Sequence, residues 1–185
     1  HKYAYTEEFG GQHDAAELLG DLLWDAPAYK LSCTVTARFH GCQHVSVTQE
    51  RHSMLVLSLP EEKGDVHVSD LVRSFFAPVE VHDRKHDDPA CGVCYQDGDV
   101  TLALEGVQPD TCVLSIKRYS EALERRADKV YPDPTLVLAG SLYSLRAVIV
   151  HQGDSTKQGH YMMYLRTAEG WERRDDGLRK VAGTD

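Results

Sequence analysis

The sequence predicts an α+β fold in a single domain, on three observations. With 185 residues and 42% apolar composition, the chain is long enough for one well-buried core and too short for two ordinary domains. Near the N-terminus, apolar residues recur at helical spacing. Further along, several runs alternate between apolar and polar residues, as half-buried strands do.

Residues 12–24 are predicted to form a helix, because their apolar side chains fall on one face. That face, which we expect to be buried, consists of Ala15, Leu18, Leu19, Leu22 and Leu23. Beside it, Asp14, Glu17 and Asp21 form an acidic stripe at positions i, i+3 and i+7. Carboxylates near a helix start complement its dipole, so a purely structural role is one interpretation of this stripe.

Strands are predicted within residues 30–37, 46–59 and 111–119, with the second ending at Pro60. Ser69 is expected to cap a short helix that contains Leu71, Val72 and Phe75. Two charged stretches lie between these elements. Residues 79–89 are typical of a solvated loop, and residues 121–128 are compatible with a helix.

The most informative stretch surrounds His160. An apolar run at residues 147–150 meets a polar turn, and an alternating run then opens on His160, which places this histidine at the mouth of a strand. Gly159 has no side chain to obstruct a substrate backbone. Asp175 follows at the next turn and would reach the imidazole if the two strands pair. A His–Asp couple is two thirds of a nucleophilic triad, although a lone histidine at a strand end is more often solvated or capped.

Charge and cysteine content restrict the class of protein. The formal net charge is −9, from 29 acidic and 20 basic residues, which argues against nucleic acid as a partner. No apolar run approaches the length of a membrane helix, and no signal-peptide pattern is present, so no membrane association is expected. An odd number of cysteines, five, indicates a reducing, intracellular compartment rather than a disulfide framework.

Several stretches resemble, in the right order, motifs of the ubiquitin-specific proteases. Residues 143–164, with Trp171, Asp175 and Asp176, resemble the C-terminal His box, and residues 12–19 resemble the Gln box. Residues 111–119 resemble the strand that carries the family's Leu-x-Ile-x-Leu-Lys-Arg-Phe pattern. These enzymes are papain-like cysteine peptidases that cut after the C-terminal glycine of ubiquitin.

The resemblance implies a role for individual residues. His160 would be the general base, Asp175 would orient it, and Asp176 would support the pair. Asp14 and Glu17 would grip the arginines of the ubiquitin tail, since carboxylates pair with guanidinium groups bidentately. The rest of the substrate-binding set would be His151, Gly159 and Tyr161.

The resemblance also implies an architecture and a zinc site. Residues 1–185 would be a catalytic domain without its N-terminal Cys-box segment: β-ribbon fingers at about 30–115, an antiparallel β palm at about 111–185, and an incomplete helical thumb. Catalysis would need no cofactor. A structural zinc ion would bind Cys42, Cys91 and Cys94, since Cys91 and Cys94 have zinc-knuckle spacing. Phe39 stands where the family has its first ligand cysteine, so a histidine, His44 or His40, would supply the fourth ligand. A knuckle that has lost its metal is the alternative.

The family's nucleophile lies in a Cys box ahead of the Gln box, and nothing of that kind precedes Gln12. The chain also contains no Asn, the residue that helps form the family's oxyanion hole. We expect the nucleophile to lie outside this chain, upstream in the same gene or in a second chain. We also expect an isolated chain to expose an apolar face and to self-associate.

Three functions remain open at this stage. The first is a deubiquitinating cysteine peptidase of the cytoplasm or nucleus, with ubiquitin and ubiquitinated proteins as partners. The second is a catalytically inactive relative, a pseudoenzyme that binds ubiquitin as a scaffold. The third is a relative specific for SUMO or another ubiquitin-like protein.

Overall fold

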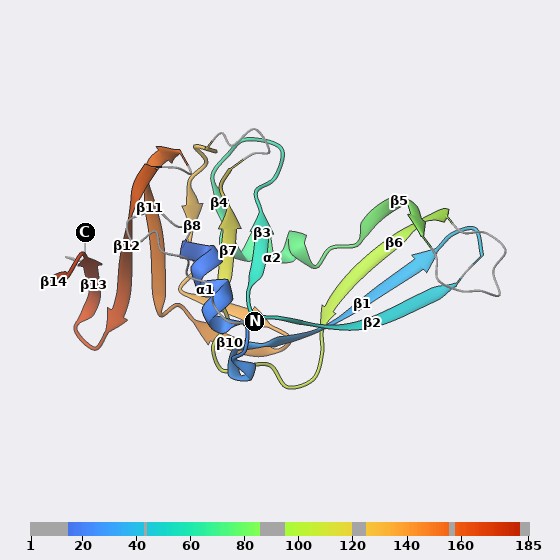
Figure 1. Ribbon diagram of the computed structural model, residues 1–185, viewed down its shortest axis with the longest axis horizontal. Coiled ribbons are helices and arrows are strands. Elements are labelled where there is room, and N and C mark those ends of the chain that lie inside the picture. The colour runs from blue at the N-terminus through green and yellow to red at the C-terminus, as the bar shows by residue number, and fades with distance from the viewer. Residues whose placement is uncertain (1–14, 43, 86–94, 120–124, 156–157, 182–185) are drawn as a thin grey trace, which may run out of the picture. The chain divides into compact units, whose positions relative to one another are not determined.

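The computed structural model describes residues 15–42, 44–85, 95–119, 125–155 and 158–181 (Figure 1). Its compact units do not follow chain order. One unit contains residues 23–117 and 128–144, and the other contains residues 118–127 and 145–185 together with the chain up to residue 22. Asp14 and the knuckle cysteines Cys91 and Cys94 lie outside the described residues.

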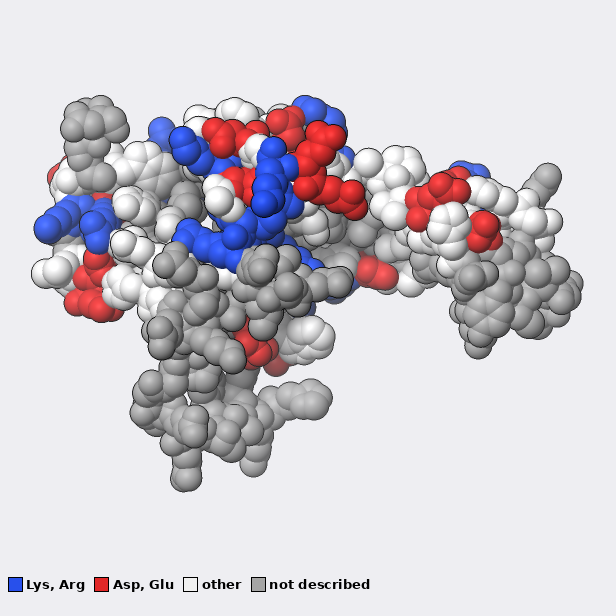
Figure 2. All heavy atoms as spheres, turned by 90° about the horizontal axis from the view of Figure 1, so that it is seen from above, with Lys and Arg blue, Asp and Glu red and all other residues white. Residues whose placement is uncertain are grey.

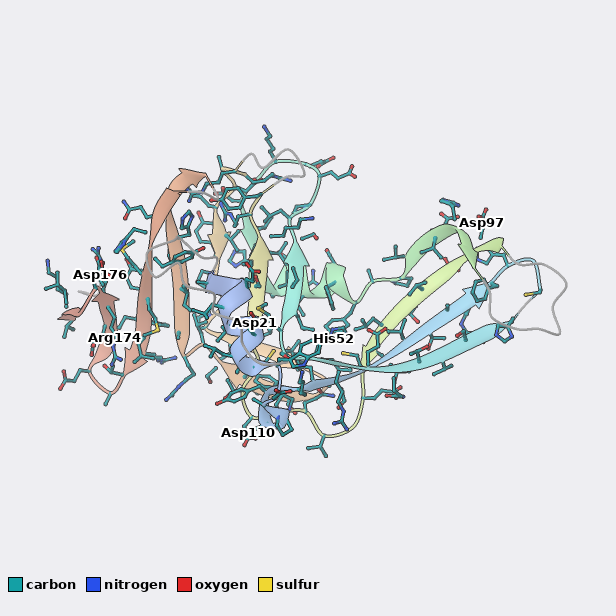
Figure 3. All side chains as sticks on the ribbon, viewed as in Figure 1. Asp21, His52, Asp97, Asp110, Arg174 and Asp176 are labelled. Atoms are coloured by element: carbon teal, nitrogen blue, oxygen red, sulfur yellow. The ribbon has the colours of Figure 1, made fainter. Side chains whose placement is uncertain are left out.

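The first unit carries a long antiparallel sheet with the strand order β2-β1-β6-β5. Its strands are β1 (Leu31–Phe39), β2 (Val45–His52), β5 (Val79–Lys85) and β6 (Tyr95–Leu104). The apolar residues Leu31, Cys33, Ala37 and Phe39 of β1 are buried on one face as predicted, and Thr34 is buried as well. This sheet corresponds to the β-ribbon that the sequence predicted; Asp97 lies near its far end in Figure 3.

The remaining strands of this unit pair locally or across long sequence distances. Strand β3 (Leu55–Ser58) is parallel to β7 (Leu114–Lys117), and β4 (Val66–His67) is parallel to β8 (Val130–Tyr131). Strands β9 (Thr135–Leu138) and β10 (Ser141–Ser144) form a hairpin. Helix α2 (Val68–Phe75) and a short 3-10 helix, η1 (Pro27–Tyr29), complete the described elements of the unit.

Among the residues that the structure describes, a hydrophobic cluster joins several of these elements. Side chains from β1, β3, α2 and β9 meet in it, and the larger members are almost fully inaccessible to solvent. They are Leu31, Cys33, Leu55, Leu57, Leu71, Val72 and Leu138. The core therefore draws on β1 and β3, which the sequence pattern indicated without their partners, and on β9, which it did not indicate.

The second unit is built on an antiparallel meander in the order β11-β12-β13-β14. The strands are β11 (Ala147–Ser155), β12 (Gln158–Thr167), β13 (Gly170–Asp175) and β14 (Leu178–Val181). Helix α1 (Ala15–Leu23) belongs to this unit up to residue 22. The α+β fold with an antiparallel palm is confirmed.

Helix α1 forms as predicted, but the expected burial of its apolar face is wrong. None of its residues is buried, and Leu22 is 58% exposed. Leu18 is also exposed. No described side chain encloses these two leucines, so the helix presents apolar surface to solvent.

Four further sequence predictions need correction. The strand predicted in 46–59 is interrupted after His52, so that β2 pairs with β1 while β3 pairs with β7. Residues 79–85 form the edge strand β5 rather than a loop, since an edge strand tolerates charged side chains. Helix α2 begins at Val68, and the amide of Ser69 donates to Asp133 instead of Ser69 acting as the cap. Residues 125–128 are not helical.

Candidate active site

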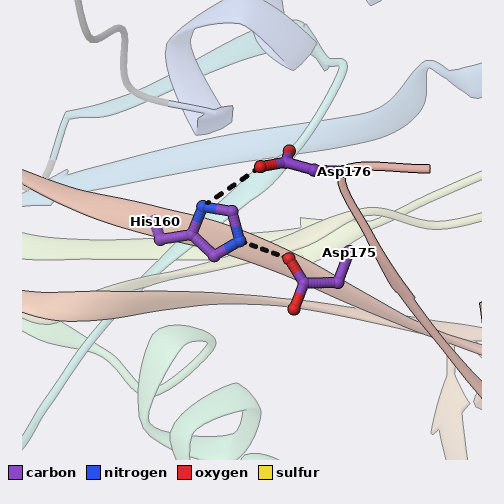
Figure 4. Close-up of side chains that lie close together, drawn as sticks. All are labelled: His160, Asp175 and Asp176. Atoms are coloured by element: carbon purple, nitrogen blue, oxygen red, sulfur yellow. Dashed lines mark hydrogen bonds and ion pairs between the residues drawn. The ribbon is translucent and has the colours of Figure 1, made fainter. Parts of the chain in front are cut away.

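His160 and Asp175 face one another across two paired strands. Strands β12 and β13 are antiparallel, with Met163 opposite Arg174 and Thr167 opposite Gly170. This pairing brings the start of β12 beside the end of β13, where His160 Nε2 hydrogen-bonds with the carboxylate of Asp175 (Figure 4). The two strands do pair, and the contact between these side chains is the one that the sequence analysis expected in that case.

Asp176 lies on the other side of the imidazole. Its Oδ2 is 3.9 Å from His160 Nδ1, too far for a hydrogen bond, and its side chain is 85% exposed. Asp176 and Gly177 form the turn between β13 and β14, with φ of 41° and 84°. An Asp-Gly pair suits such a turn because both residues tolerate left-handed backbone. Figure 3 shows Asp176 at this end of the meander.

The charges around His160 favour its protonated form. The hydrogen bond with Asp175 raises the pKa of His160 above its ordinary value of 6.5, with further electrostatic contributions from Asp175 and Asp176. Partial desolvation and Arg173 oppose this rise. Conversely, hydrogen bonds from His160 and Arg173 lower the pKa of Asp175, against its own desolvation. Asp175 is therefore ionised across the physiological range.

The two shifts define a pH window. Because folding raises the pKa of His160, its contribution to stability is complete below pH 6.5 and is lost as the pH rises through the folded pKa. Because folding lowers the pKa of Asp175, its contribution is complete above about pH 4 and is lost as the pH falls through the folded pKa. The pair is thus most stabilising between about pH 4 and 6.5.

Arg173 is a member of this site that the sequence did not identify. Its Nη2 donates to Asp175 Oδ2 at 2.5 Å, so the carboxylate is held by His160 through one oxygen and by Arg173 through the other. Arg173 and Asp175 are two positions apart on β13 and therefore share a face of the strand. That spacing was the available signal.

The predicted substrate residues His151, Gly159 and Tyr161 lie together. The rings of His151 and Tyr161 are 4.7 Å apart between centroids, and the two residues are paired in the β11–β12 register. A Cβ atom at Gly159 would lie against the His151 ring, so the space above this glycine is filled by a side chain of the protein itself. The hydroxyl of Tyr119, which the sequence did not single out, lies 3.1 Å from His151 Nδ1.

The remaining predicted site residues are only partly described. Glu17 is exposed on α1. Cys42 and His44 lie within the connection between β1 and β2, where the Phe39 amide donates to the His44 carbonyl. Since Cys91 and Cys94 lie outside the described residues, the zinc site stays a prediction.

Within the described ranges, the one cluster of three potential metal ligands is the His160, Asp175 and Asp176 group. Its hydrogen bond already engages Nε2 of the ring with Asp175. The arrangement is that of an oriented histidine, in which a carboxylate fixes the ring and leaves the second nitrogen for proton transfer.

Two of the cysteines sit in environments that suppress reactivity. Burial raises the pKa of the Cys33 thiol to about 11, with a contribution from Glu50, and it raises that of Cys112 to about 11, with a contribution from Cys33. A thiolate is the reactive form of cysteine, so neither residue is activated as a nucleophile.

The described helices include no segment that is both long enough and apolar enough to cross a membrane. Figure 2 shows acidic and basic side chains gathered in patches of both signs on the face that it presents.

Comparison with solved structures supports the fold. The chain is similar to a chain of the SAGA Ubp8/Sgf11/Sus1/Sgf73 DUB module bound to ubiquitin aldehyde, with a TM-score of 0.74 and 18% identity. The match covers 94% of this chain and 46% of that one. Another structure of the module, bound to monoubiquitin, gives a TM-score of 0.75 and 19% identity over 94% of this chain and 45% of the other.

Comparison of sequences shows the family. Human ubiquitin carboxyl-terminal hydrolase 17-like proteins 15 and 11 are 35% and 33% identical over 99 residues. Each match covers 46% of this chain and 18% of the relative, so the chain spans well under half the length of these relatives. The family model for ubiquitin carboxyl-terminal hydrolase matches residues 26–184. The chain therefore belongs to the ubiquitin carboxyl-terminal hydrolase family and is a member of the ubiquitin-specific proteases, as its motifs predicted.

Proposed function

We propose that this chain supplies the general base and its orienting carboxylate to a cysteine-type deubiquitinase. The reaction is hydrolysis of the peptide or isopeptide bond after the C-terminal glycine of ubiquitin. The observation that carries this proposal is the hydrogen bond between His160 Nε2 and Asp175 on paired strands, in a chain of this family.

The contacts of His160 suit proton transfer to and from a thiol. With its Nε2–H donated to Asp175, the ring presents the lone pair of Nδ1, which accepts the thiol proton as the sulfur attacks the carbonyl carbon. The same proton passes to the leaving amine when the C–N bond breaks, and a thioester remains. His160 then takes a proton from water as the water oxygen attacks the thioester carbon, and it returns that proton to the sulfur as the C–S bond breaks, which releases the thiol and the ubiquitin carboxyl group. Asp175 stays ionised throughout, because its pKa is held low.

The attacking thiol comes, in this proposal, from outside the 185 residues. The high pKa of Cys33 and Cys112 supports that assignment, because burial holds both thiols protonated. Cys42, Cys91 and Cys94 are assigned to a structural zinc ion with His44, by the knuckle spacing of the last two cysteines.

Substrate binding is assigned to two groups of residues. Asp14 and Glu17 pair with the arginines of the ubiquitin tail, since carboxylates bind guanidinium groups bidentately. The second group, His151, Gly159 and Tyr161, is assigned to the tail by the resemblance to the family; within it the His151 ring packs on Gly159 and against the Tyr161 ring. The odd number of cysteines supports an intracellular location, cytoplasmic or nuclear.

A second candidate function is that of a ubiquitin-binding scaffold without catalysis. It is favoured by one observation, the absence of an activated thiol at Cys33 and Cys112. In that case His160 and Asp175 would be retained as structure rather than as catalysts. A relative that acts on SUMO or another ubiquitin-like protein is the third.

A pair of measurements tests these alternatives. Binding of ubiquitin and of SUMO to the chain is measured by calorimetry, with Glu17→Arg as the test variant and Asp21→Arg as a control on the same helix. We expect ubiquitin binding that Glu17→Arg weakens at least tenfold and that Asp21→Arg leaves within twofold. Equal effects of both variants, or tighter binding of SUMO, would refute the assignment of the tail contact.

Hydrolysis is measured in a fusion that places a Cys-box segment of the family ahead of the chain, with a fluorogenic C-terminal amide of ubiquitin as substrate. We expect turnover that His160→Gln lowers by about 10³-fold or more, since removal of one member of such a triad has effects of this size. Ubiquitin binding without turnover in the fusion would favour the scaffold.

A further inference from the structure

His151 and His160 lie on opposite faces of the β11–β12 hairpin. Successive side chains of a strand alternate between faces, so Tyr161 points away from the face that carries His160. His151 is the register partner of Tyr161, and their rings are in contact. The His151 imidazole therefore supports the hairpin from the face opposite the His160–Asp175 pair.

The His151 ring occupies the space next to the backbone of Gly159. A Cβ atom at residue 159 would lie 1.9 Å from His151 Nε2, 2.5 Å from Cε1 and 2.8 Å from Cδ2. These distances are far inside van der Waals contact, so any other residue at this position would displace the ring or the strand. Because Gly159 immediately precedes His160, the ring abuts the part of β12 from which the candidate base projects.

Residues near the end of β7 hold this arrangement in place. The Tyr119 hydroxyl lies 3.1 Å from His151 Nδ1, and the Arg125 guanidinium donates to the carbonyl oxygen of Gly153 at 2.6 Å. Tyr119 and Arg125 are themselves joined in a β-bridge. Tyr119 and Arg125 thus each contact the hairpin, Tyr119 through the His151 ring that packs on Gly159.

From these contacts we propose that His151 is a positioning residue, whose ring is wedged against Gly159 and held by the Tyr119 hydroxyl so that His160 meets Asp175. The importance of this contact for catalysis rests on the proposed function, whereas the packing of the His151 ring on Gly159 follows from the contacts alone. The position of a general base must be held closely, because a displacement of about 1 Å can lower the rate about 10²-fold.

The test reads the ionisation of His160 directly and needs no nucleophile. The ring nitrogens of the ¹⁵N-labelled chain are titrated by NMR, and the His160 signals are identified by their loss in His160→Gln. In the unmodified chain the pKa of His160 is expected above 6.5, since Asp175 is the main cause of its rise. Gly159→Ala and His151→Ala are expected to bring it down toward 6.5, because either change loosens the contact between His160 and Asp175.

Conservative variants separate positioning from general destabilisation. His151→Phe keeps a ring over Gly159 and is expected to restore most of the His160 shift that His151→Ala loses. Tyr119→Phe removes one hydroxyl and is expected to lower the pKa in the same direction by less. The controls are Gly64→Ala, which has open space for a Cβ atom, and Tyr131→Phe, which removes a hydroxyl that bonds to Asp65; both should leave His160 unchanged.

An unchanged His160 titration in a folded His151→Ala or Gly159→Ala chain would overturn the proposal. If those variants do not fold, the remaining variants decide. An unchanged His160 pKa in Tyr119→Phe, or a His160 pKa in His151→Phe that is no higher than in unfolded chain, would also overturn the proposal. Ubiquitin binding is recorded in parallel. Loss of the shift in a chain that does not bind ubiquitin would leave the wedge standing and refute only the proposed function.

Discussion

The thiols of Cys33 and Cys112 should react more slowly in the folded chain than an ordinary cysteine does. Each has a pKa of about 11, against an ordinary value of 9.0. At pH 7.5 the thiolate fraction is therefore about 0.03%, where an ordinary cysteine would have about 3%. The fraction of reactive form is lower by roughly a hundredfold.

Part of this loss is offset by chemistry. A thiolate of higher pKa is the stronger nucleophile, and a difference of about two pKa units raises its rate constant roughly tenfold. Each thiol should therefore react about tenfold more slowly than an ordinary cysteine. Access adds a second barrier for Cys33, whose exposed fraction is 0%. A reagent reaches it only when the core opens locally, so its alkylation should follow unfolding rather than ionisation.

The assay is timed alkylation with iodoacetamide at pH 7.5, followed by peptide mass spectrometry, with the chain in urea as the reference. Both cysteines should react at least about tenfold more slowly in the folded chain than in urea. The same samples are incubated with ubiquitin that carries a thiol-reactive C-terminal electrophile. A ubiquitin adduct on either cysteine, or alkylation as fast as in urea, would refute the conclusion that these thiols are inactive.

Three further outcomes follow from the contacts described above. Leu57→Ala should lower the free energy of unfolding by about 3 kcal/mol or more, because Leu57 is fully buried. Val56→Ala, on the same strand but exposed, should lower it by well under half of that amount. Urea unfolding measures both variants, and equal losses of stability would contradict the assigned core. Leu22→Lys should reduce self-association, measured by sedimentation, since this leucine is exposed; a monomeric unmodified chain would contradict this prediction. Asp175→Asn should lower the pKa of His160, measured by NMR. It should also remove the loss of stability that accompanies the rise of pH through that pKa, measured as melting temperature against pH. An unchanged pKa of His160 would contradict the pairing.

Local patterns were sufficient for the parts of the site that lie close in sequence. An alternating run opens on His160 and a carboxylate, Asp175, follows fifteen residues later, so the two would meet if adjacent strands joined by a short connection paired, as β12 and β13 do. The contact between His160 and Asp175 follows from that pairing. Arg173 lay within the same stretch, and its two-residue spacing from Asp175 was the signal that would have separated it from Arg174.

Other predictions failed because periodicity reports which faces of a segment are apolar, not which segment lies beside it. The break of residues 46–59 into β2 and β3 depends on two distant partners, β1 and β7. The same is true of β5, whose charged residues resemble a loop until β6 is present to pair with them. The exposure of Leu22 likewise depends on what packs over α1 and not on the spacing of its leucines.

The sequence by itself determined the family, the α+β class, the strand that bears His160 and the aspartate that meets it, because each rests on a motif or on neighbours along the chain. Only the tertiary structure decided that the His151 ring fills the space over Gly159, that Tyr119 holds that ring, and that burial holds Cys33 protonated. The physical reason is that steric exclusion and desolvation depend on every atom that surrounds a group in space. Those atoms come from segments whose pairing no local pattern specifies.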